Sequence, residues 1–213
     1  MKNLITPRNV RNFIHALKDM GVDMYLFDKG DAMTLSKLQK EVRQCRQCAL
    51  AATRKNVVFG EGDVNARLVF VGEAPGEEED IQGRPFVGRA GKLLDQLIER
   101  TGLGRSDVYI CNVLKCRPPG NRDPEEQERE VCKRYLFTQL ELIDPEIICA
   151  LGRHAYNTLL GVDERITRVR GVLTSYRGTP LLPTYHPSFL LRNQNKVKEA
   201  WEDMEKLKQL LRK

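Results

Sequence analysis

The amino-acid sequence predicts an α/β protein, a three-layer α/β/α sandwich with a four-stranded, mainly parallel central sheet. Two observations predict this fold class. Four short segments are apolar enough to be buried strands, and amphipathic helical patterns alternate with them along the chain. The 213 residues, 41% of them hydrophobic and 30% charged, are typical of one soluble domain that is large enough to bury a core.

The predicted strands are short and apolar. Their ranges are 67–72 (RLVFVG), 108–113 (VYICNV), 146–152 (EIICALG) and 181–185 (LLPTY). The first three are almost continuously apolar, as expected for parallel strands that helices cover on both faces. The dipeptide Arg177-Gly178 predicts a hairpin turn that leads into the fourth strand.

Helical patterns fill the gaps between these strands. Leucine and isoleucine at positions 93, 94, 97 and 98 form an apolar stripe that ends before Gly102. Asp123 can cap the next helix and Pro124 suits its first turn, so we expect that helix to run to about Leu142. A third helix is expected after Gly152, and a fourth from about residue 197 onwards.

The first 40 residues differ from the rest, and we expect an N-terminal helical extension at 1–40 and the main domain at 41–213. Two groups of apolar residues each fit one face of a helix. They are Val10, Phe13, Ile14 and Leu17 in the first group and Leu35, Leu38 and Val42 in the second. We interpret both groups as packing faces and not as a separate recognition element.

Charge and targeting signals limit the partners. The chain carries 35 Lys and Arg against 29 Asp and Glu, a net charge of +6, which favours a polyanionic partner. No apolar run approaches the roughly 18 residues of a membrane span, and the first residues, MKNLITPRNVRN, lack a signal peptide. We therefore expect a cytoplasmic monomer with no membrane association. In that reducing compartment the six cysteines predict metal ligands or core thiols and not disulfides.

Unusual side chains follow the predicted strands. The first strand ends in GEAPGEEED (72–80), the second in Asn112 and the fourth in HPSFLLR (186–192). Ligands of open α/β sheets bind beyond the carboxyl ends of the strands, so these residues predict one site. GRPFVGRA (83–90) has the glycine spacing of a phosphate loop but lacks its Lys-Ser/Thr pair, and the nearby acids would repel phosphate. An acidic rim better suits a developing cation or an activated water.

The cysteines predict a second site. Cys45 and Cys48 form a CxxC pair, Cys116 follows the second strand, and Cys132 lies in the helix after it. These four thiols could ligate either zinc or an iron–sulfur cluster. The other two cysteines lie inside apolar strands and are interpreted as buried core thiols: Cys111 and Cys149.

Four motifs in register carry a family resemblance. GEAPGEEED, GRPFVGRAG, NVLKCRPPGNR and HPSFLLR, with cysteines at 45, 48, 116 and 132, make residues 41–211 similar to family 4 uracil-DNA glycosylases, the thermostable-type iron–sulfur enzymes of bacteria and archaea. The resemblance implies a uracil-DNA glycosylase-like fold and a [4Fe–4S] cluster on those four cysteines. It also implies a DNA repair enzyme that flips uracil out of single- or double-stranded DNA and hydrolyses its N-glycosidic bond, which starts base excision repair.

The resemblance assigns roles to five residues around the base. Phe86 would stack on uracil, Asn112 would read it through its amide, and His186 would hydrogen-bond O2 as the uracil anion departs. Glu79 would exclude the methyl group of thymine, and Asn121 would help to orient the substrate.

Further assignments concern the attacking water and the DNA. Glu73 is the candidate for stabilising the sugar cation or orienting the water, because this chain has Ala74, beside the uracil, where better-known uracil glycosylases have an Asp. Leu190 and Leu191 are candidates for the wedge that fills the vacated base stack, and Arg192 for a phosphate contact. Two histidines are interpreted as surface or helix residues: His15 and His154.

Two competing functions belong to other classes. A non-catalytic iron–sulfur module that binds nucleic acid would have no use for the set Phe86, Asn112 and His186. A relative that traps uracil-DNA covalently uses a histidine in an inserted loop, whereas here no histidine lies between Asn112 and Arg153. A uracil-release assay separates these functions.

Overall fold

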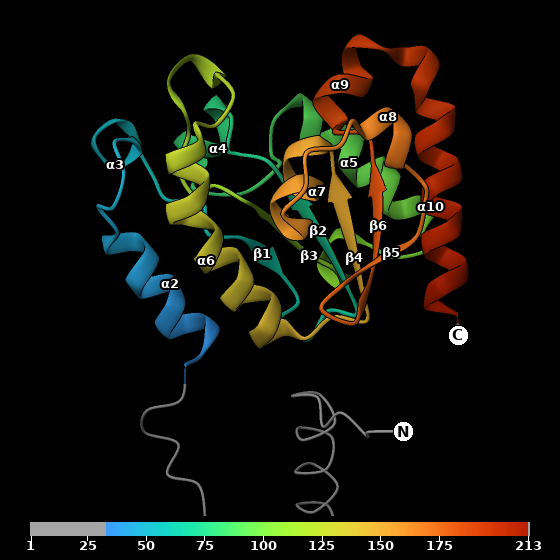
Figure 1. Cartoon of the computed structure of the whole chain (residues 1–213), viewed down its shortest axis with the longest axis horizontal. Helices are drawn as coiled ribbons and strands as arrows, with labels where there is room; N and C mark the ends of the chain where they lie inside the picture. The colour runs from blue at the N-terminus through green and yellow to red at the C-terminus, as the bar shows by residue number, and fades with distance from the viewer. Residues whose placement is uncertain (1–32, 213) are drawn as a thin grey trace, which may run out of the picture.

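A six-stranded sheet forms the middle layer of the computed structural model, which describes residues 33–212 (Figure 1). The strand order is β1-β3-β2-β4-β6-β5. Strands β3, β2, β4 and β6 are parallel, while β1 pairs antiparallel with β3 and β5 pairs antiparallel with β6. The strands are β1 Glu61–Gly62, β2 Leu68–Gly72, β3 Tyr109–Asn112, β4 Ile147–Leu151, β5 Thr174–Tyr176 and β6 Thr179–Thr184.

The predicted number of strands, four, is wrong, because the sheet has six. The four predicted strands form the parallel centre, and two short antiparallel strands extend it at the edges. β1 has two residues and β5 has three, which is too few for an alternating pattern to be recognised in the sequence. β5 belongs to the hairpin predicted at Arg177-Gly178, where both turn residues have positive φ, 48° and 92°.

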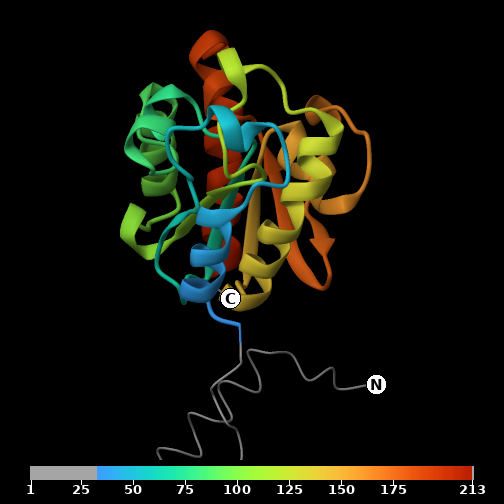
Figure 2. The same ribbon diagram turned by 90° about the vertical axis from the view of Figure 1, so that its left-hand side faces the viewer.

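Helices cover both faces of the sheet, as predicted for a three-layer sandwich (Figures 1 and 2). α2, α6 and α7 pack over one face of the sheet, and α5, α9 and α10 pack over the other. All residues of β2, β3 and β4 are buried between these layers, which explains their continuous apolar sequences. The α-helices are α2 Leu35–Gln44, α3 Leu50–Thr53, α4 Glu77–Gln82, α5 Arg89–Arg100, α6 Glu126–Ile143, α7 Arg153–Leu160, α8 Ile166–Val169, α9 Pro187–Arg192 and α10 Val197–Leu211, and the short 3-10 helices are η1 Arg105–Asp107, η2 Pro119–Asn121 and η3 Gln194–Lys196.

The start of helix α6 differs from the prediction. Its cap is Glu125 and not Asp123. The Glu128 carboxylate accepts a hydrogen bond from the Glu125 N–H (2.9 Å), and this capping box satisfies a donor at the helix end. Asp123 therefore lies before the helix, where it lines the cavity described below.

The N-terminal prediction is covered only in part. Residues 1–32, which contain the first apolar group, lie outside the described residues. In the second group Leu38 and Val42 of α2 are buried in the core with residues of α6, so this group is a packing face. The predicted domain boundary after residue 40 falls inside α2. Within residues 33–212, no helix is long and apolar enough to span a membrane.

Candidate functional site

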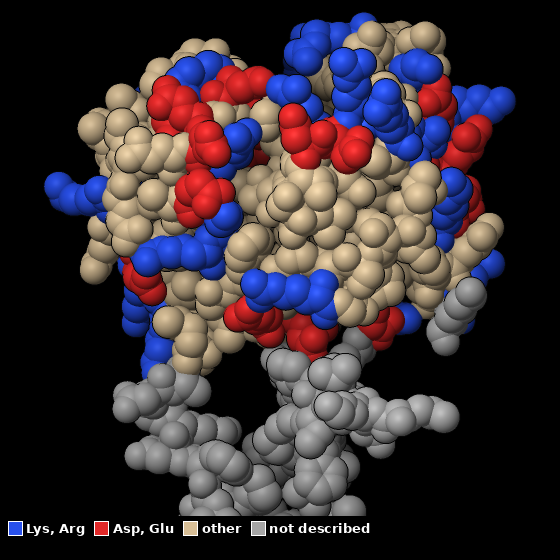
Figure 3. Space-filling model, viewed as in Figure 1, with Lys and Arg blue, Asp and Glu red and all other residues tan. Residues whose placement is uncertain are grey.

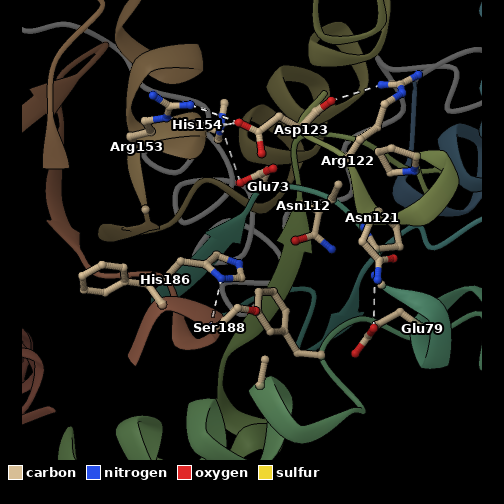
Figure 4. Close-up of a pocket in the computed structure, with 18 of the residues that line it drawn as sticks. Glu73, Glu79, Asn112, Asn121, Arg122, Asp123, Arg153, His154, His186 and Ser188 are labelled. Carbon is tan, nitrogen blue, oxygen red and sulfur yellow. Dashed lines mark hydrogen bonds and ion pairs between the residues drawn. The ribbon is translucent and has the colours of Figure 1, made fainter. Parts of the chain in front are cut away.

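A cavity of about 510 Å³ opens at the carboxyl ends of the parallel strands (Figure 4). Its walls come from the loop after β2, the loop before α5, the end of β3, the η2 loop and the starts of α7 and α9. The sequence-predicted residues that line it are Glu73, Ala74, Glu79, Phe86, Asn112, Asn121, His186 and Arg192. These residues, which follow different strands in the sequence, therefore line one cavity.

His186 presents a hydrogen-bond donor to this cavity. It caps α9, and its Nδ1 accepts a hydrogen bond from the Ser188 N–H at 3.2 Å. Burial, together with the charges of Arg192 and His154, lowers the pKa of His186 to about 4. The ring is therefore neutral at neutral pH, and because Nδ1 accepts, the proton lies on Nε2. Nε2 is buried and has no hydrogen-bond partner among the described residues.

Asn112 supplies a complementary group at the end of β3. Its side chain is only 1% exposed, and its Oδ1 is buried without a partner among residues 33–212. Gly72 lies opposite, at the end of β2. A Cβ at position 72 would collide with Asn112 Oδ1 and with the Phe86 ring, so the glycine makes room for both side chains.

Phe86 is buried in a strained conformation. Its φ is +51°, in the left-handed region that residues other than glycine rarely adopt. Its ring lies 5.7 Å from the His186 ring, centroid to centroid. Arg105 holds the loop by donating from Nη2 to the Pro85 carbonyl (2.5 Å) and from Nη1 to the Phe86 carbonyl (3.2 Å). Gly91 lets α5 approach the same carbonyl, because a Cβ there would collide with Phe86 O.

Two of the acids that follow β2 accept hydrogen bonds from backbone N–H groups and do not form an acidic rim. Glu79 accepts hydrogen bonds from the N–H groups of Val87 (2.8 Å) and Gly88 (2.9 Å) through Oε1, and from Gly76 N–H (3.1 Å) through Oε2. Asp80 accepts from the backbone N–H of Lys55 at 3.0 Å. The sequence interpretation of this run as a rim for a developing cation is therefore too broad. Glu79 joins the loop after β2 to the loop that carries Phe86.

Glu73 keeps its carboxylate in the cavity. Burial and the charge of Asp123, opposed by Arg153 and Arg129, raise the pKa of Glu73 to about 7. A carboxylate that titrates near neutral pH can exchange a proton with water or carry negative charge toward a cation. Its side chain is 27% exposed, and His154 Nε2 lies 3.9 Å from its Oε2.

His154 is a cavity residue that the sequence interpretation missed. His154 is a helix residue, as expected, the second residue of α7, and it also lines the cavity. Its Nε2 lies 3.3 Å from Asp123 Oδ2, and its Nδ1 lies 3.3 Å from Arg129 Nη1. One signal in the sequence could have found it, because His154 directly follows the carboxyl end of the third predicted strand. His15 lies outside the described residues.

The ligand atoms of Glu73, Asp123 and His154 all lie within 4.8 Å of one another, a spacing that could hold a divalent cation. Arg129 contacts the histidine, however, and Arg153 Nη2 donates to Asp123 Oδ2 at 3.1 Å. These two positive charges oppose the binding of a cation, so the carboxylates are balanced by the protein itself.

The predicted wedge needs one correction. Leu190 is fully buried in the core with α5 and α10, so it cannot enter a base stack in this conformation. Leu191, its neighbour on α9, is half-buried. Phe189 lines the cavity and stacks on Tyr185, with 5.0 Å between ring centroids.

The four predicted ligand cysteines meet at a second, smaller cavity. Cys45 ends α2, Cys48 precedes α3, Cys116 follows β3 and Cys132 lies on α6, and all four line the same space. The other two cysteines, Cys111 and Cys149, are fully buried in β3 and β4, as interpreted.

The surroundings of these thiols suit a negatively charged metal–thiolate group. Arg54 donates from Nη1 to Cys116 Sγ (3.2 Å), and the Lys115 N–H donates to Cys132 Sγ (3.4 Å). Burial raises the pKa of Cys132 to about 12, so this thiol stays protonated unless a metal displaces the proton. Four sulfur atoms that line one cavity, with a cation beside them, fit a Cys₄ metal centre.

A buried lysine joins the two sites. Lys115 is 1% exposed, and its Nζ donates to the Asn112 carbonyl at 2.7 Å and to the side chain of Gln139. Its backbone N–H contacts Cys132. Lys115, which borders the cysteine cavity, thus holds the end of β3 that carries Asn112.

Comparisons with known proteins agree with this geometry. The family model described as "Uracil DNA glycosylase superfamily" matches residues 59–205. The chain is 48% identical over 180 residues to a type-4 uracil-DNA glycosylase of Thermotoga maritima, a match that covers 83% of this chain and 94% of the relative. It is 49% identical to the type-4 enzyme of Saccharolobus solfataricus (83% and 86% covered) and 42% identical to that of Archaeoglobus fulgidus (83% and 93% covered).

Proposed function

Because the chain belongs to the type-4 uracil-DNA glycosylases, within the uracil DNA glycosylase superfamily, we propose that its cavity receives a uracil flipped out of DNA and that the residues around it cleave the N-glycosidic bond. The chain is a uracil-DNA glycosylase, a hydrolase that starts base excision repair. The proposals below concern the substrate's contacts, the roles of individual residues and the cofactor.

Base recognition rests on one observation: two buried polar atoms without partners, Asn112 Oδ1 and His186 Nε2, lie in the same cavity. Uracil offers an N3–H donor for the first and an O2 acceptor for the second, and the Asn112 amide N–H can donate to O4. The Phe86 ring stacks on the base. Cytosine lacks the N3–H and presents a donor in place of O4, so it leaves buried groups unpaired.

Cleavage moves the electron pair of the C1′–N1 bond onto uracil and leaves positive charge on the sugar. The neutral Nε2–H of His186 donates to O2, where part of the negative charge of the departing uracil develops. Because the ring is neutral, it stabilises this anion by hydrogen bonding and keeps its proton. Ionised Glu73 stabilises the sugar cation and orients the water, which adds its oxygen to C1′ and loses a proton to solvent. The side chain of Ala74 contributes no group to this step.

Two further cavity residues select and orient the substrate. Glu79 lies at the cavity wall, where its hydrogen bonds fix the loops beside the base, and we assign it the exclusion of the thymine methyl group. Asn121 in the η2 loop accepts a hydrogen bond from Arg117 Nε (2.8 Å) and is assigned to orientation of the nucleotide.

DNA approaches this rim from the side where basic side chains gather. Figure 3 shows Lys and Arg side chains grouped around α8 and α9, above a band of acidic ones. Arg192 ends α9 and lines the cavity, so it is suited to a phosphate contact. Leu191 remains the candidate wedge. The phosphates of the bound DNA add to the stabilisation of the sugar cation.

Cys45, Cys48, Cys116 and Cys132 are proposed to hold a [4Fe–4S] cluster, with Arg54 balancing its charge. The cluster would supply a cross-link between α2, the end of β3 and α6. Hydrolysis transfers no electron to or from the substrate, so a structural role is sufficient.

The test is release of base from oligonucleotides that carry one uracil, with thymine and cytosine at the same position as controls. We expect release of uracil alone, from single- and double-stranded DNA, and loss of that release in His186→Ala with an unchanged melting temperature. A folded wild-type protein that binds the oligonucleotide without releasing uracil would instead support a binding module. A protein–DNA adduct that survives denaturation would support the covalent relative.

A further inference from the structure

The backbone carbonyl of Asn112 is buried and points away from β2. The Val113 N–H donates to the Gly72 carbonyl on β2 at 3.0 Å, and in a planar trans peptide the C=O group points opposite to the N–H of the next residue. On the outer side β1 pairs with Tyr109 and Ile110, and its register ends there, so none of the described strands pairs with Asn112 on this side. A buried carbonyl at such a place needs a donor from elsewhere in the protein.

Lys115 supplies this donor. Its side chain turns back by three residues, and its Nζ donates to the Asn112 carbonyl at 2.7 Å. The Gln139 side chain on α6 accepts a second hydrogen bond from the same Nζ. Lys115 is 1% exposed and Gln139 is fully buried, so water cannot take over either contact. The position of the lysine amine is therefore determined by these two oxygens.

Gln139 is itself oriented by two further hydrogen bonds. Its Nε2 donates to the Phe59 carbonyl at 2.9 Å and to Tyr109 Oη at 3.2 Å. Because the amide nitrogen is committed to these acceptors, Oε1 is the atom that faces Lys115. Gly60 leaves room for the tyrosine, since a Cβ at that position would lie 2.8 Å from Tyr109 Oη. The network thus joins α6, β3 and the segment before β1.

We propose that Lys115 and Gln139 are positioning residues for uracil recognition: at the end of β3 they take the place of a neighbouring strand and keep the Asn112 amide in the orientation that reads the base. The inference rests on the proposed function, in which Asn112 pairs with uracil. Neither Lys115 nor Gln139 lines the cavity at the strand ends, so both act through Asn112.

The same lysine lies next to the cysteine cavity. Its backbone N–H donates to Cys132 Sγ at 3.4 Å, and the next residue, Cys116, lines that cavity. Iron content is therefore measured for every variant, so that loss of the proposed cluster is told apart from loss of the contact with Asn112.

The first experiment is single-turnover uracil release by Lys115→Met, made in the full chain, which removes the donor and keeps an unbranched side chain. We expect about a 5- to 20-fold loss in the wild-type background, and less than about a twofold further loss in an Asn112→Ala background, where the amide that Lys115 positions is absent. The inhibition constant of free uracil should rise by a similar factor. The Kd for a uracil-free single-stranded oligonucleotide should stay within about twofold, because DNA contacts outside the pocket do not depend on Asn112.

Two variants of Gln139 test the same support and leave the lysine in place. Gln139→Glu keeps an oxygen that accepts from Nζ, whereas Gln139→Leu does not, so the glutamate variant should release uracil about 3- to 10-fold faster than the leucine variant. Leu136→Ala is the control on the same helix, because Leu136 is fully buried and contributes no hydrogen bond to the network. It should lower the melting temperature and leave the rate within about twofold of wild type.

Two results would overturn the inference: a wild-type rate in a folded Lys115→Met protein, or an equal loss from this change in the wild-type and Asn112→Ala backgrounds. If Lys115→Met does not fold or holds less iron than the wild type, the two Gln139 variants decide, and equal rates in them would overturn the inference. A wild-type protein that releases no uracil would refute the proposed function, a result distinct from these.

Discussion

Phe86 and Asn121 adopt left-handed backbone conformations, with φ of 51° and 56°, a cost of about 1 kcal/mol or more for each residue. Near them, Asn112 Oδ1 and His186 Nε2 are buried without partners in the described part of the chain. Folding alone would not favour any of these states. All four residues line one cavity, where a ligand can supply the contacts that the two buried atoms lack.

The first residue-scale prediction concerns base reading by Asn112. In Asn112→Asp the amide donor to O4 becomes an acceptor. The binding of uracil in the transition state should weaken by about 1–3 kcal/mol, roughly a tenfold to hundredfold loss in the rate of uracil release. Cytosine presents an N4 donor at the same place, so the rate of cytosine release relative to uracil release should rise in the variant. The measurement is base release from single-stranded oligonucleotides that carry one U or one C.

Asn112→Ala is the matched control for that change. It removes donor and acceptor together, so the rate of uracil release should fall and the rate of cytosine release should not rise. If Asn112→Asp releases uracil at the wild-type rate, Asn112 does not read the base and only ends its strand.

The second residue-scale prediction uses the pKa of Glu73. Because the native pKa of about 7 lies above the ordinary value of 4.5, the folded protein holds a proton between these pH values that the unfolded chain has lost. Stability therefore falls as pH rises through this window. Glu73→Gln should raise the unfolding free energy by about 2 kcal/mol at pH 8, and the gain should fade toward pH 4.5. Urea denaturation at several pH values measures it.

Glu77→Gln provides the comparison at the start of the next helix, α4, because Glu77 is exposed and forms a 3.5 Å ion pair with Arg117. It should change stability by less than about 0.5 kcal/mol at either pH. A Glu73→Gln gain that is equal at pH 5 and pH 8 would contradict the raised pKa.

The sequence could predict which side chains lie at the strand ends, because the rule for parallel sheets places them without coordinates. Asn112, Glu73 and His186 were found in this way. The contact of His154 with Asp123 could not be predicted, since it depends on how the start of α7 meets a segment 30 residues earlier in the chain. Leu190 was misplaced because the rotation of α9, which buries this leucine, is set by tertiary packing.

At the scale of elements, the loop before α5 depends on one arginine from η1. Arg105 binds the carbonyls of Pro85 and Phe86 and also pairs with Asp95 on α5 at 2.8 Å. Arg105→Met should release the strained loop and lower the single-turnover excision rate by about tenfold, because the stacking ring loses its fixed position. Thermal unfolding should show a loss of stability of similar size, about 1–2 kcal/mol.

Arg84→Met is the control for this loop. Arg84 pairs with Glu61 at 2.6 Å on the exposed side, and its described contacts do not include Phe86. Its excision rate should stay within about twofold of wild type. Equal losses in the two variants would show that general loosening of the loop, and not the support of Phe86, limits the rate.

The central elements could be predicted because each has a strong local pattern, continuous apolar runs for the parallel strands and an apolar stripe for α5. The edge strands β1 and β5 have no such pattern. Antiparallel pairing with a neighbouring strand determines their structure, and their own side chains do not. The start of α6 was predicted at the wrong residue because the sequence offers two acids as its cap, Asp123 and Glu125. The hydrogen bond from the Glu125 N–H to the Glu128 carboxylate makes Glu125 the cap.

For the whole molecule, the four cysteines lie together although they come from segments far apart in the sequence, which the proposed cluster would link. Cys132→Ala should lose most of the iron and lower the melting temperature, because α6 is then no longer joined to α2 and to the end of β3. Cys149→Ala, in the middle of the sheet, should keep its iron and lose only about 1 kcal/mol from a small cavity. Iron analysis, absorbance near 400 nm and thermal unfolding measure the two variants. Full iron in the first variant and loss in the second would refute the ligand assignment.

The two unpaired cavity atoms, Asn112 Oδ1 and His186 Nε2, have a consequence for turnover. Free uracil retains its N3–H and O2, so both contacts outlast the broken bond, and departure of the base leaves the same two atoms without partners again. If Asn112 and His186 bind the base as proposed, the contacts that select uracil also slow its release. Multiple turnover should be limited by product release, and free uracil should compete with DNA for the enzyme, while a single round of cleavage runs at its full rate.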